Sequence, residues 1–280
     1  MASFNLVEFI LPILNILLGL GIARKTAGLI NVGQSVQFIL VIIFLEIGSQ
    51  LFQFYKNEFI NSAKGNKDEK ERGASLILVI LFYALCVLPL SQLFLSQHNN
   101  FPFLITSAIT AFFSILWRNF GKGAIPEFIS KIFFILNNSF FLPLSQLSLF
   151  GVEINLIFIS IFQILFLLLF TFLFMREVYR IEIIGNESGI VKLMGTIPAW
   201  RISVISSLIA CILFTLLAFK QPGIGLRIAS IVIAGLLIPV LRIFISPLQH
   251  GKNGLIKSCR LIESTGVVIY LGLIFFLWVN

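Results

Sequence analysis

Long apolar runs separated by short polar stretches dominate this chain. The runs are about 18 to 22 residues long, the length that an α-helix needs to cross a bilayer. No alternating β pattern occurs between them. We therefore predict an all-α integral membrane protein, a bundle of nine transmembrane helices that forms a single domain over residues 1–280. The expected spans are residues 5–22, 33–53, 75–95, 102–117, 126–147, 153–174, 200–218, 224–245 and 262–279.

Polar residues and prolines interrupt the fifth expected span. Pro126 and Pro143 should kink or break the helix, because proline has no backbone N–H to donate. Asn137, Asn138 and Gln146 could supply hydrogen bonds to neighbouring helices.

The composition supports the membrane interpretation. The chain has 280 residues, of which 58% are hydrophobic and only 11% are charged, whereas a soluble domain carries roughly 25% charged residues. The net charge of +8 points to cytoplasmic loops rather than to nucleic acid. The three cysteines and two histidines show no redox or zinc spacing, and we expect the cysteines to be buried. The first run has no signal-peptide features and is expected to be a retained span.

The basic residues predict the orientation. Most Lys and Arg residues lie in the loops that follow the second, fourth, sixth and eighth spans. The other side has only Arg24, Lys25, Lys220 and Arg227. By the positive-inside rule, the N-terminus is cytoplasmic and the C-terminus lies on the opposite side, in a membrane of the bacterial inner-membrane type.

A polar stripe lies at the end of the second span. Glu46, Gln50, Gln53 and Asn57 are spaced at i, i+4, i+7 and i+11, and therefore share one helix face. Lys56 lies beside them. We expect the stripe to point into the protein interior or a water-filled cavity, because lipid offers no hydrogen-bond partners. Glu46 would either bind a ligand or pair with a buried polar residue.

A second polar stretch closes the sixth span. Arg176 and Arg180 lie one helical turn apart, followed by Glu182 and Lys192. These cations would hold a phosphate or diphosphate directly, or form an ordinary positive cytoplasmic helix end. We expect the two polar ends to face one another.

Three stretches resemble a known family. Residues 48–59 (GSQLFQFYKNEF) are similar to a G-x-N-L-x-N-D-Y-x-D-F motif. Residues 128–151 (FISKIFFILNNSFFLPLSQLSLFG) are similar to that family's fifth helix, and residues 176–195 (REVYRIEIIGNESGIVKLMG) to its N-N-x-R-D-I-E-x-D motif. The chain thus resembles the UbiA superfamily of intramembrane prenyltransferases, and most closely its menaquinone-pathway branch.

The resemblance implies a fold and a chemistry. Members have nine transmembrane helices around a lipid-accessible cavity, which cytoplasmic loops 2–3 and 6–7 cap. Two Asp-rich motifs in these loops hold Mg²⁺ and the diphosphate of a polyprenyl donor.

The departures from the family pattern change the expected activity. Residues 53–57 read QFYKN where the first motif has N-D-x-x-D, so both carboxylates are absent. Arg180 stands in place of the leading Asp of the second motif, and the next Asp position falls on Ile184 or Gly185. The single aspartate of the chain, Asp68, lies in a charged loop.

We therefore expect a non-catalytic relative without metal or cofactor. It would bind an isoprenoid, quinone or pigment-type lipid, or act as a membrane subunit of a larger complex, with other membrane proteins and lipids but no nucleic acid as partners. The expected lipid- or diphosphate-binding residues are Glu46, Gln50, Gln53, Lys56, Asn57, Arg176, Arg180, Glu182 and Lys192.

The alternative is an active aromatic prenyltransferase of the quinone pathway. In that protein Glu58, Glu182 and Glu187 would replace the lost aspartates as ligands of Mg²⁺. A transporter or channel is disfavoured, because few charges lie at mid-membrane.

Overall fold

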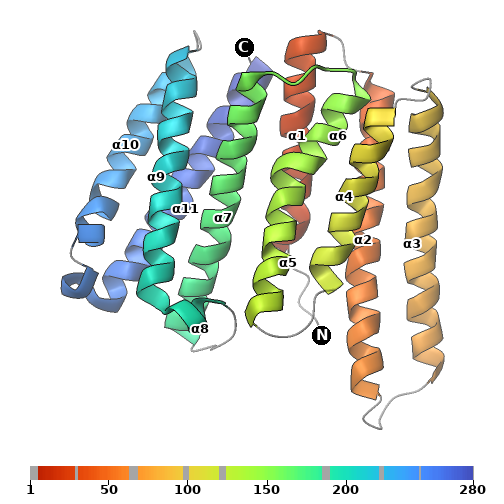
Figure 1. Ribbon diagram of the computed structural model, residues 1–280, viewed down its shortest axis with the longest axis horizontal. Coiled ribbons are helices and arrows are strands. Elements are labelled where there is room, and N and C mark those ends of the chain that lie inside the picture. Colours follow the sequence, from red (N-terminus) through yellow and green to blue (C-terminus); the bar gives the residue numbers. More distant parts are fainter. Residues whose placement is uncertain are drawn as a thin grey trace. The chain divides into compact units, whose positions relative to one another are not determined.

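The structure is a computed structural model in which long helices follow one another along the chain (Figure 1). It describes residues 6–28, 31–62, 69–96, 101–119, 124–184, 190–220, 224–245 and 247–279. The elements are α1 (Leu6–Ala27), α2 (Val32–Ser62), α3 (Glu69–Ser96), α4 (Phe101–Asn119), α5 (Ala124–Leu136), the π-helical segment η1 (Asn137–Phe141), α6 (Leu142–Leu149), α7 (Leu156–Ile184), α8 (Ile190–Met194), α9 (Thr196–Lys220), α10 (Ile224–Ile245) and α11 (Pro247–Val279).

The expected spans correspond to these helices one by one. Because α5, η1 and α6 follow without a break, they form one helix that matches the fifth span. The described residues contain no β-strand. The prediction of an all-α chain with nine long helices is therefore confirmed for the part that the structure describes.

The helices have the length and composition of membrane spans. Among the residues described, seven helices are long and apolar enough to cross a membrane, and a shorter apolar stretch covers Phe101–Trp117. Only 17% of the apolar window of α3 and 22% of that of α10 is buried, so these two helices present apolar side chains outward, as contact with lipid requires. The chain is a multi-pass membrane protein.

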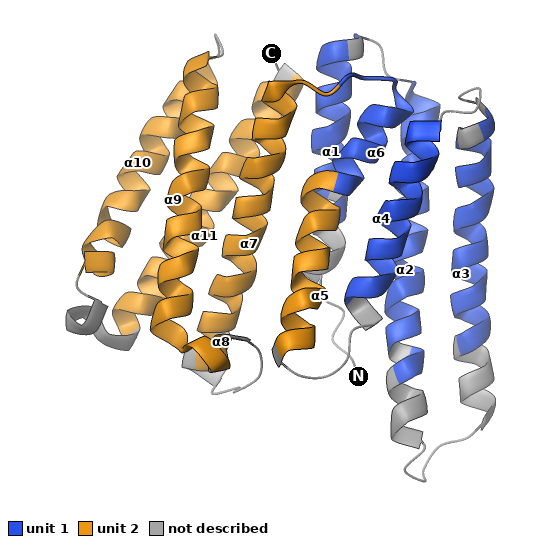
Figure 2. Ribbon diagram, in the orientation of Figure 1, with its two compact units in different colours: residues 1–120, 141–153 blue, residues 121–140, 154–280 orange. Residues whose placement is uncertain are grey.

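The chain divides into two compact units (Figure 2). Unit 1 comprises residues 1–120 and 141–153, and unit 2 comprises residues 121–140 and 154–280. The boundary falls inside the long helix, since α5 and most of η1 belong to unit 2 and α6 belongs to unit 1. The organisation as a single domain stays a prediction.

The two prolines do not break the fifth span. Pro126 lies in the first turn of α5, where a backbone N–H has no partner within the helix. Pro143 is the second residue of α6, which follows the π-helical segment, and such a segment can accommodate a local disruption of the hydrogen-bond ladder. The Nδ2 of Asn138 donates a hydrogen bond to the Phe134 carbonyl of its own helix at 2.9 Å. The expected hydrogen bond from Asn138 to a neighbouring helix is therefore not formed by this N–H group.

A close contact between α1 and α6 organises unit 1. A Cβ atom at Gly19 would overlap the Gln146 side chain, whose carboxamide is fully buried against the glycine. Neither Oε1 nor Nε2 of Gln146 has a hydrogen-bond partner among the described residues. Contrary to expectation, the Gln146 side chain therefore makes no hydrogen bond to a neighbouring helix in the described part of the chain. Beside it, the hydroxyls of Thr110 on α4 and Ser145 on α6 are 3.0 Å apart and hydrogen-bonded.

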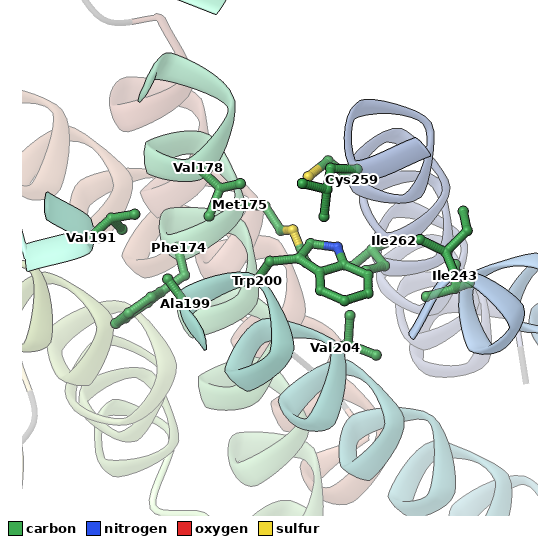
Figure 3. Packing of buried hydrophobic residues seen from close by; sticks show 12 residues of the cluster. Phe174, Met175, Val178, Val191, Ala199, Trp200, Val204, Ile243, Cys259 and Ile262 are labelled. Carbon is green, nitrogen blue, oxygen red and sulfur yellow. The ribbon is translucent and has the colours of Figure 1, made fainter. Parts of the chain in front are cut away.

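A buried cluster around Trp200 forms the core of unit 2 (Figure 3). The indole Nε1 donates to the Ser258 hydroxyl at 2.7 Å, which joins α9 to α11. Met175 and Val178 of α7 belong to the same cluster. This core therefore holds the last turns of α7 in place. Cys259 lies in it, and all three cysteines are buried and free, as expected.

The Gly19 contact predicts a steric effect on stability. Gly19→Leu should destabilise the protein by about 1–3 kcal/mol, because the new side chain overpacks the contact with Gln146. Gln146→Ala in the same chain should restore much of the loss. Thermal unfolding in detergent measures both changes. Gly235→Leu is the control, since nothing lies within 4 Å of a Cβ atom at Gly235; an equal loss there would contradict the explanation.

Candidate lipid head-group site

Five predicted site residues lie on α2, in unit 1. Glu46 is 3% exposed, in the middle of the helix. Gln50 is partly buried, and its Nε2 has no hydrogen-bond partner among the described residues. Lys56 is partly exposed, Gln53 is exposed, and the side chain of Asn57 lies outside the described residues. Gln53 is thus not buried in the protein interior, and whether the stripe lines a water-filled cavity stays a prediction.

The other four predicted residues lie in unit 2, at the end of α7 and on α8. Arg176 is partly exposed. The side chains of Arg180 and Glu182 on α7, and of Lys192 on α8, lie outside the described residues. The structure describes each group within its own unit. That the two polar ends face one another stays a prediction.

The short helix α8 lies at the end of unit 2 where α7 ends and α5 begins (Figure 1). It contacts α5, α7 and α9. Gly195 separates α8 from α9 with a positive φ of 86°, a conformation that glycine adopts without steric penalty. Its N–H donates to the Val191 carbonyl at 2.8 Å. This turn sends the chain from α8 directly into α9.

Three charged side chains meet at this end of unit 2. The Lys131 ammonium on α5 donates to Oε1 of Glu127, one turn earlier, at 2.9 Å. The same Nζ lies 2.9 Å from Oε1 of Glu177 on α7. We call these three residues the ion triplet. Exposed fractions of the side chains are 6% for Glu177, 20% for Lys131 and 36% for Glu127, so the contact between the two helices is its most buried part.

The ion triplet makes two membrane-embedded charges tolerable. A carboxylate as buried as Glu177 would be expensive in a membrane helix unless it were paired. Lys131 provides the pairing charge, and Glu127 adds a second acceptor for the ammonium. Because Glu127 lies in the first turn of α5, the helix dipole also stabilises its negative charge. The arrangement fixes the register of α5 against α7.

Sequence reasoning missed Lys131, although a signal was present. Lys131 is a charge inside the fifth expected span, and Glu127 precedes it at i−4, the spacing of an ion pair on one helix face. A lysine in an apolar span is a candidate functional residue by its rarity alone. Its partner on α7 could not be identified without the helix register.

An aromatic ladder runs along α7 from the ion triplet. It consists of Phe162, Phe166, Phe170 and Phe174, spaced by four residues, together with Phe128 of α5 and Phe140 of η1. Centroids of neighbouring rings are 4.5 to 6.3 Å apart. From first to last residue on α7 the ladder covers about 18 Å of helix. The repeat of Phe at i, i+4, i+8 and i+12 is visible in the sequence.

Comparison with known proteins connects this arrangement to a fold. No family model and no curated protein matches the chain. Solved structures do match. A UbiA homologue from Archaeoglobus fulgidus bound to GPP and Mg²⁺ has a TM-score of 0.56 at 15% identity, covering 96% of this chain and 95% of that chain. A DMAPP- and Mg²⁺-bound UbiA homologue from the same organism has a TM-score of 0.57 at 13% identity, and the match covers 94% of this chain and 96% of that chain.

A third structure of a UbiA homologue from this organism has a TM-score of 0.54 at 17% identity, and the match covers 98% of this chain and 96% of that chain. The chain has the UbiA fold. The expectation of a UbiA-like helical bundle is thereby confirmed at the level of the fold.

The ion triplet does not fit the Mg²⁺ that accompanies this fold in the two ligand-bound structures. Mg²⁺ needs near-octahedral oxygen ligands at about 2.0–2.1 Å. Here an ammonium lies 2.9 Å from Oε1 of both Glu127 and Glu177, and its positive charge would repel a divalent cation. Among the described residues, no group of three or more His, Cys, Asp and Glu is placed to hold a metal.

Breaking the ion triplet should destabilise unit 2. Lys131→Met leaves the Glu177 carboxylate buried without its cation, which costs about 3–5 kcal/mol for a buried pair. The double variant Lys131→Met, Glu177→Met should recover most of this loss, because both charges are then gone. Thermal unfolding in detergent measures the effect. Lys257→Met, which removes an exposed lysine of the same unit, should change little.

Proposed function

We propose that this protein is a UbiA-type membrane protein that binds an isoprenoid lipid and does not transfer it. The observation that carries the proposal is the pairing of Glu177 with Lys131. The resemblance assigns a metal-binding motif to this end of α7, and one carboxylate of the matching stretch, Glu177, is held by a lysine from α5. The fold supports a lipid-binding role, while this pairing argues against metal-assisted transfer.

The aromatic ladder offers a surface for the tail. Isoprenoid chains are branched and apolar, and aromatic faces provide large contact area with limited side-chain entropy. Phe166 and Phe170 are only partly buried, so their rings are accessible to a ligand. Since an isoprenoid gains little over lipid by burial alone, selectivity would come from the head group at the ion triplet.

In this proposal, the ion triplet lies on the cytoplasmic side, because the loops at this end carry most of the basic residues. Under this proposal, the lipid-bound chain also associates with other membrane-protein subunits. The competing function is an active prenyltransferase with Glu58, Glu182 and Glu187 as replacement ligands. The GPP and DMAPP bound with Mg²⁺ in the fold relatives favour it.

Lipid analysis and a transfer assay distinguish the two functions. Protein purified from its native membrane should carry an isoprenoid lipid, identified by mass spectrometry. With Mg²⁺ and radiolabelled geranylgeranyl diphosphate, it should not transfer the prenyl group to aromatic acceptors. Turnover that Glu182→Gln abolishes would establish the transferase instead. A protein that is stable alone, with no companion chain, would remove the subunit role.

The aromatic ladder predicts where tail affinity resides. Phe166→Ala and Phe170→Ala should each weaken geranylgeraniol binding about tenfold, because each loses one ring contact worth roughly 1–1.5 kcal/mol. Native mass spectrometry with detergent-solubilised protein measures the change. Phe219→Ala is the matched control, since this ring is 67% exposed on α9. A similar loss in the control would show that the ladder is not the tail surface.

A further inference from the structure

Lys131 lies between two carboxylates of the ion triplet. Oε1 of Glu127 and Oε1 of Glu177 both lie 2.9 Å from its Nζ, so the two carboxylates converge on one ammonium. We propose that Lys131 is a built-in cation that makes this site independent of divalent metals, and that the isoprenoid bound here has an uncharged head group. The inference rests on the proposed function and names the class of its ligand.

The charge balance of the site supports an uncharged ligand. Within the ion triplet, the positive charge of Lys131 is already offset by the carboxylates of Glu127 and Glu177. The triplet therefore offers no surplus positive charge to an anionic head group.

A diphosphate head group would bind less favourably at the ion triplet than an uncharged one. It brings several negative charges into a region of low dielectric, where uncompensated charge is costly. Divalent metal would normally offset that charge. Here Glu127 and Glu177 already hold Lys131, so these two carboxylates do not bind a metal together. Both effects disfavour a diphosphate head group relative to a neutral one.

Lys131 also has a suitable donor for a neutral head group. An ammonium has three N–H donors, and the contacts with Glu127 and Glu177 use two of them. The side chain is 20% exposed, and in this proposal its third donor faces a ligand oxygen. A hydroxyl or quinone carbonyl oxygen would accept this hydrogen bond without adding charge. The preferred ligand class is therefore a polyprenyl alcohol or quinone.

A matched pair of probes tests the inference on the full-length protein. Geranylgeraniol and geranylgeranyl diphosphate share one tail and differ only in the head group. In detergent, with and without Mg²⁺, the alcohol should bind at least about tenfold more tightly than the diphosphate, and Mg²⁺ should change neither affinity. Tighter binding of the diphosphate, enhanced by Mg²⁺, would overturn the inference while leaving isoprenoid binding intact. If neither probe binds, the proposed function fails, and this inference with it.

A charge variant provides a second test. Glu177→Gln removes one negative charge and keeps the shape of the side chain, while Lys131 retains Glu127 as its partner. Diphosphate affinity should rise about tenfold, because one negative charge is removed from the head-group site. Glu153→Gln, which removes the same charge from an exposed position in unit 1, should not change the diphosphate affinity. An unchanged diphosphate affinity in Glu177→Gln would overturn the inference.

Discussion

The pairing of a lysine with a buried glutamate constrains the structure around it. Neither Lys131 nor Glu177 could be placed alone in a membrane helix at acceptable free energy, so α5 and α7 must bring Nζ and Oε1 to within hydrogen-bonding distance, here 2.9 Å. That requirement sets the register of the two helices. Once the register is set, Phe128 of α5 lies beside Phe174 of α7, with ring centroids 6.0 Å apart. The aromatic ladder thus depends on the ion triplet.

The remaining contacts follow from the weak hydrophobic driving force between helices in lipid. Helices in a membrane associate through close packing and polar contacts rather than through removal of water. In unit 1, a glycine on α1 gives space to the buried side chain of Gln146. In unit 2, the hydrogen bond from Trp200 to Ser258 lies inside an apolar cluster that includes Met175 of α7. The residue after Met175 is Arg176, so this packing also orients the candidate site.

A fold and the chemistry of a site carried on it are separable properties. A fold can persist while the residues of its site change, and here the scaffold matches the UbiA homologue structures over 96% of the chain. A divalent metal has open coordination positions for a ligand, whereas a lysine provides one charge and a few directed donors. Under the proposal made above, Lys131 takes the place of such a metal, which would change the head groups that the site holds without a different arrangement of helices.

The helices could be predicted from the sequence because span length and hydropathy are local properties. Their ends could not, since α2 continues to Ser62 and α11 begins at Pro247, beyond the apolar windows that defined residues 33–53 and 262–279. Pro143 shows a second limit. Whether a proline breaks a membrane helix depends on how the surrounding structure satisfies the freed backbone groups, and here the chain continues through a π-helical segment.

For the candidate site, the sequence alone identified polar residues at the ends of α2 and α7, because charge in an apolar span is conspicuous. Its resemblance to the family also predicted that the aspartates of both motifs are absent. Only the tertiary structure joined Lys131 to Glu177. These residues lie on separate helices, and sequence distance carries no information about which turns of two helices meet. The pairing and the helix register form together when the two helices pack, which is a property of the tertiary structure.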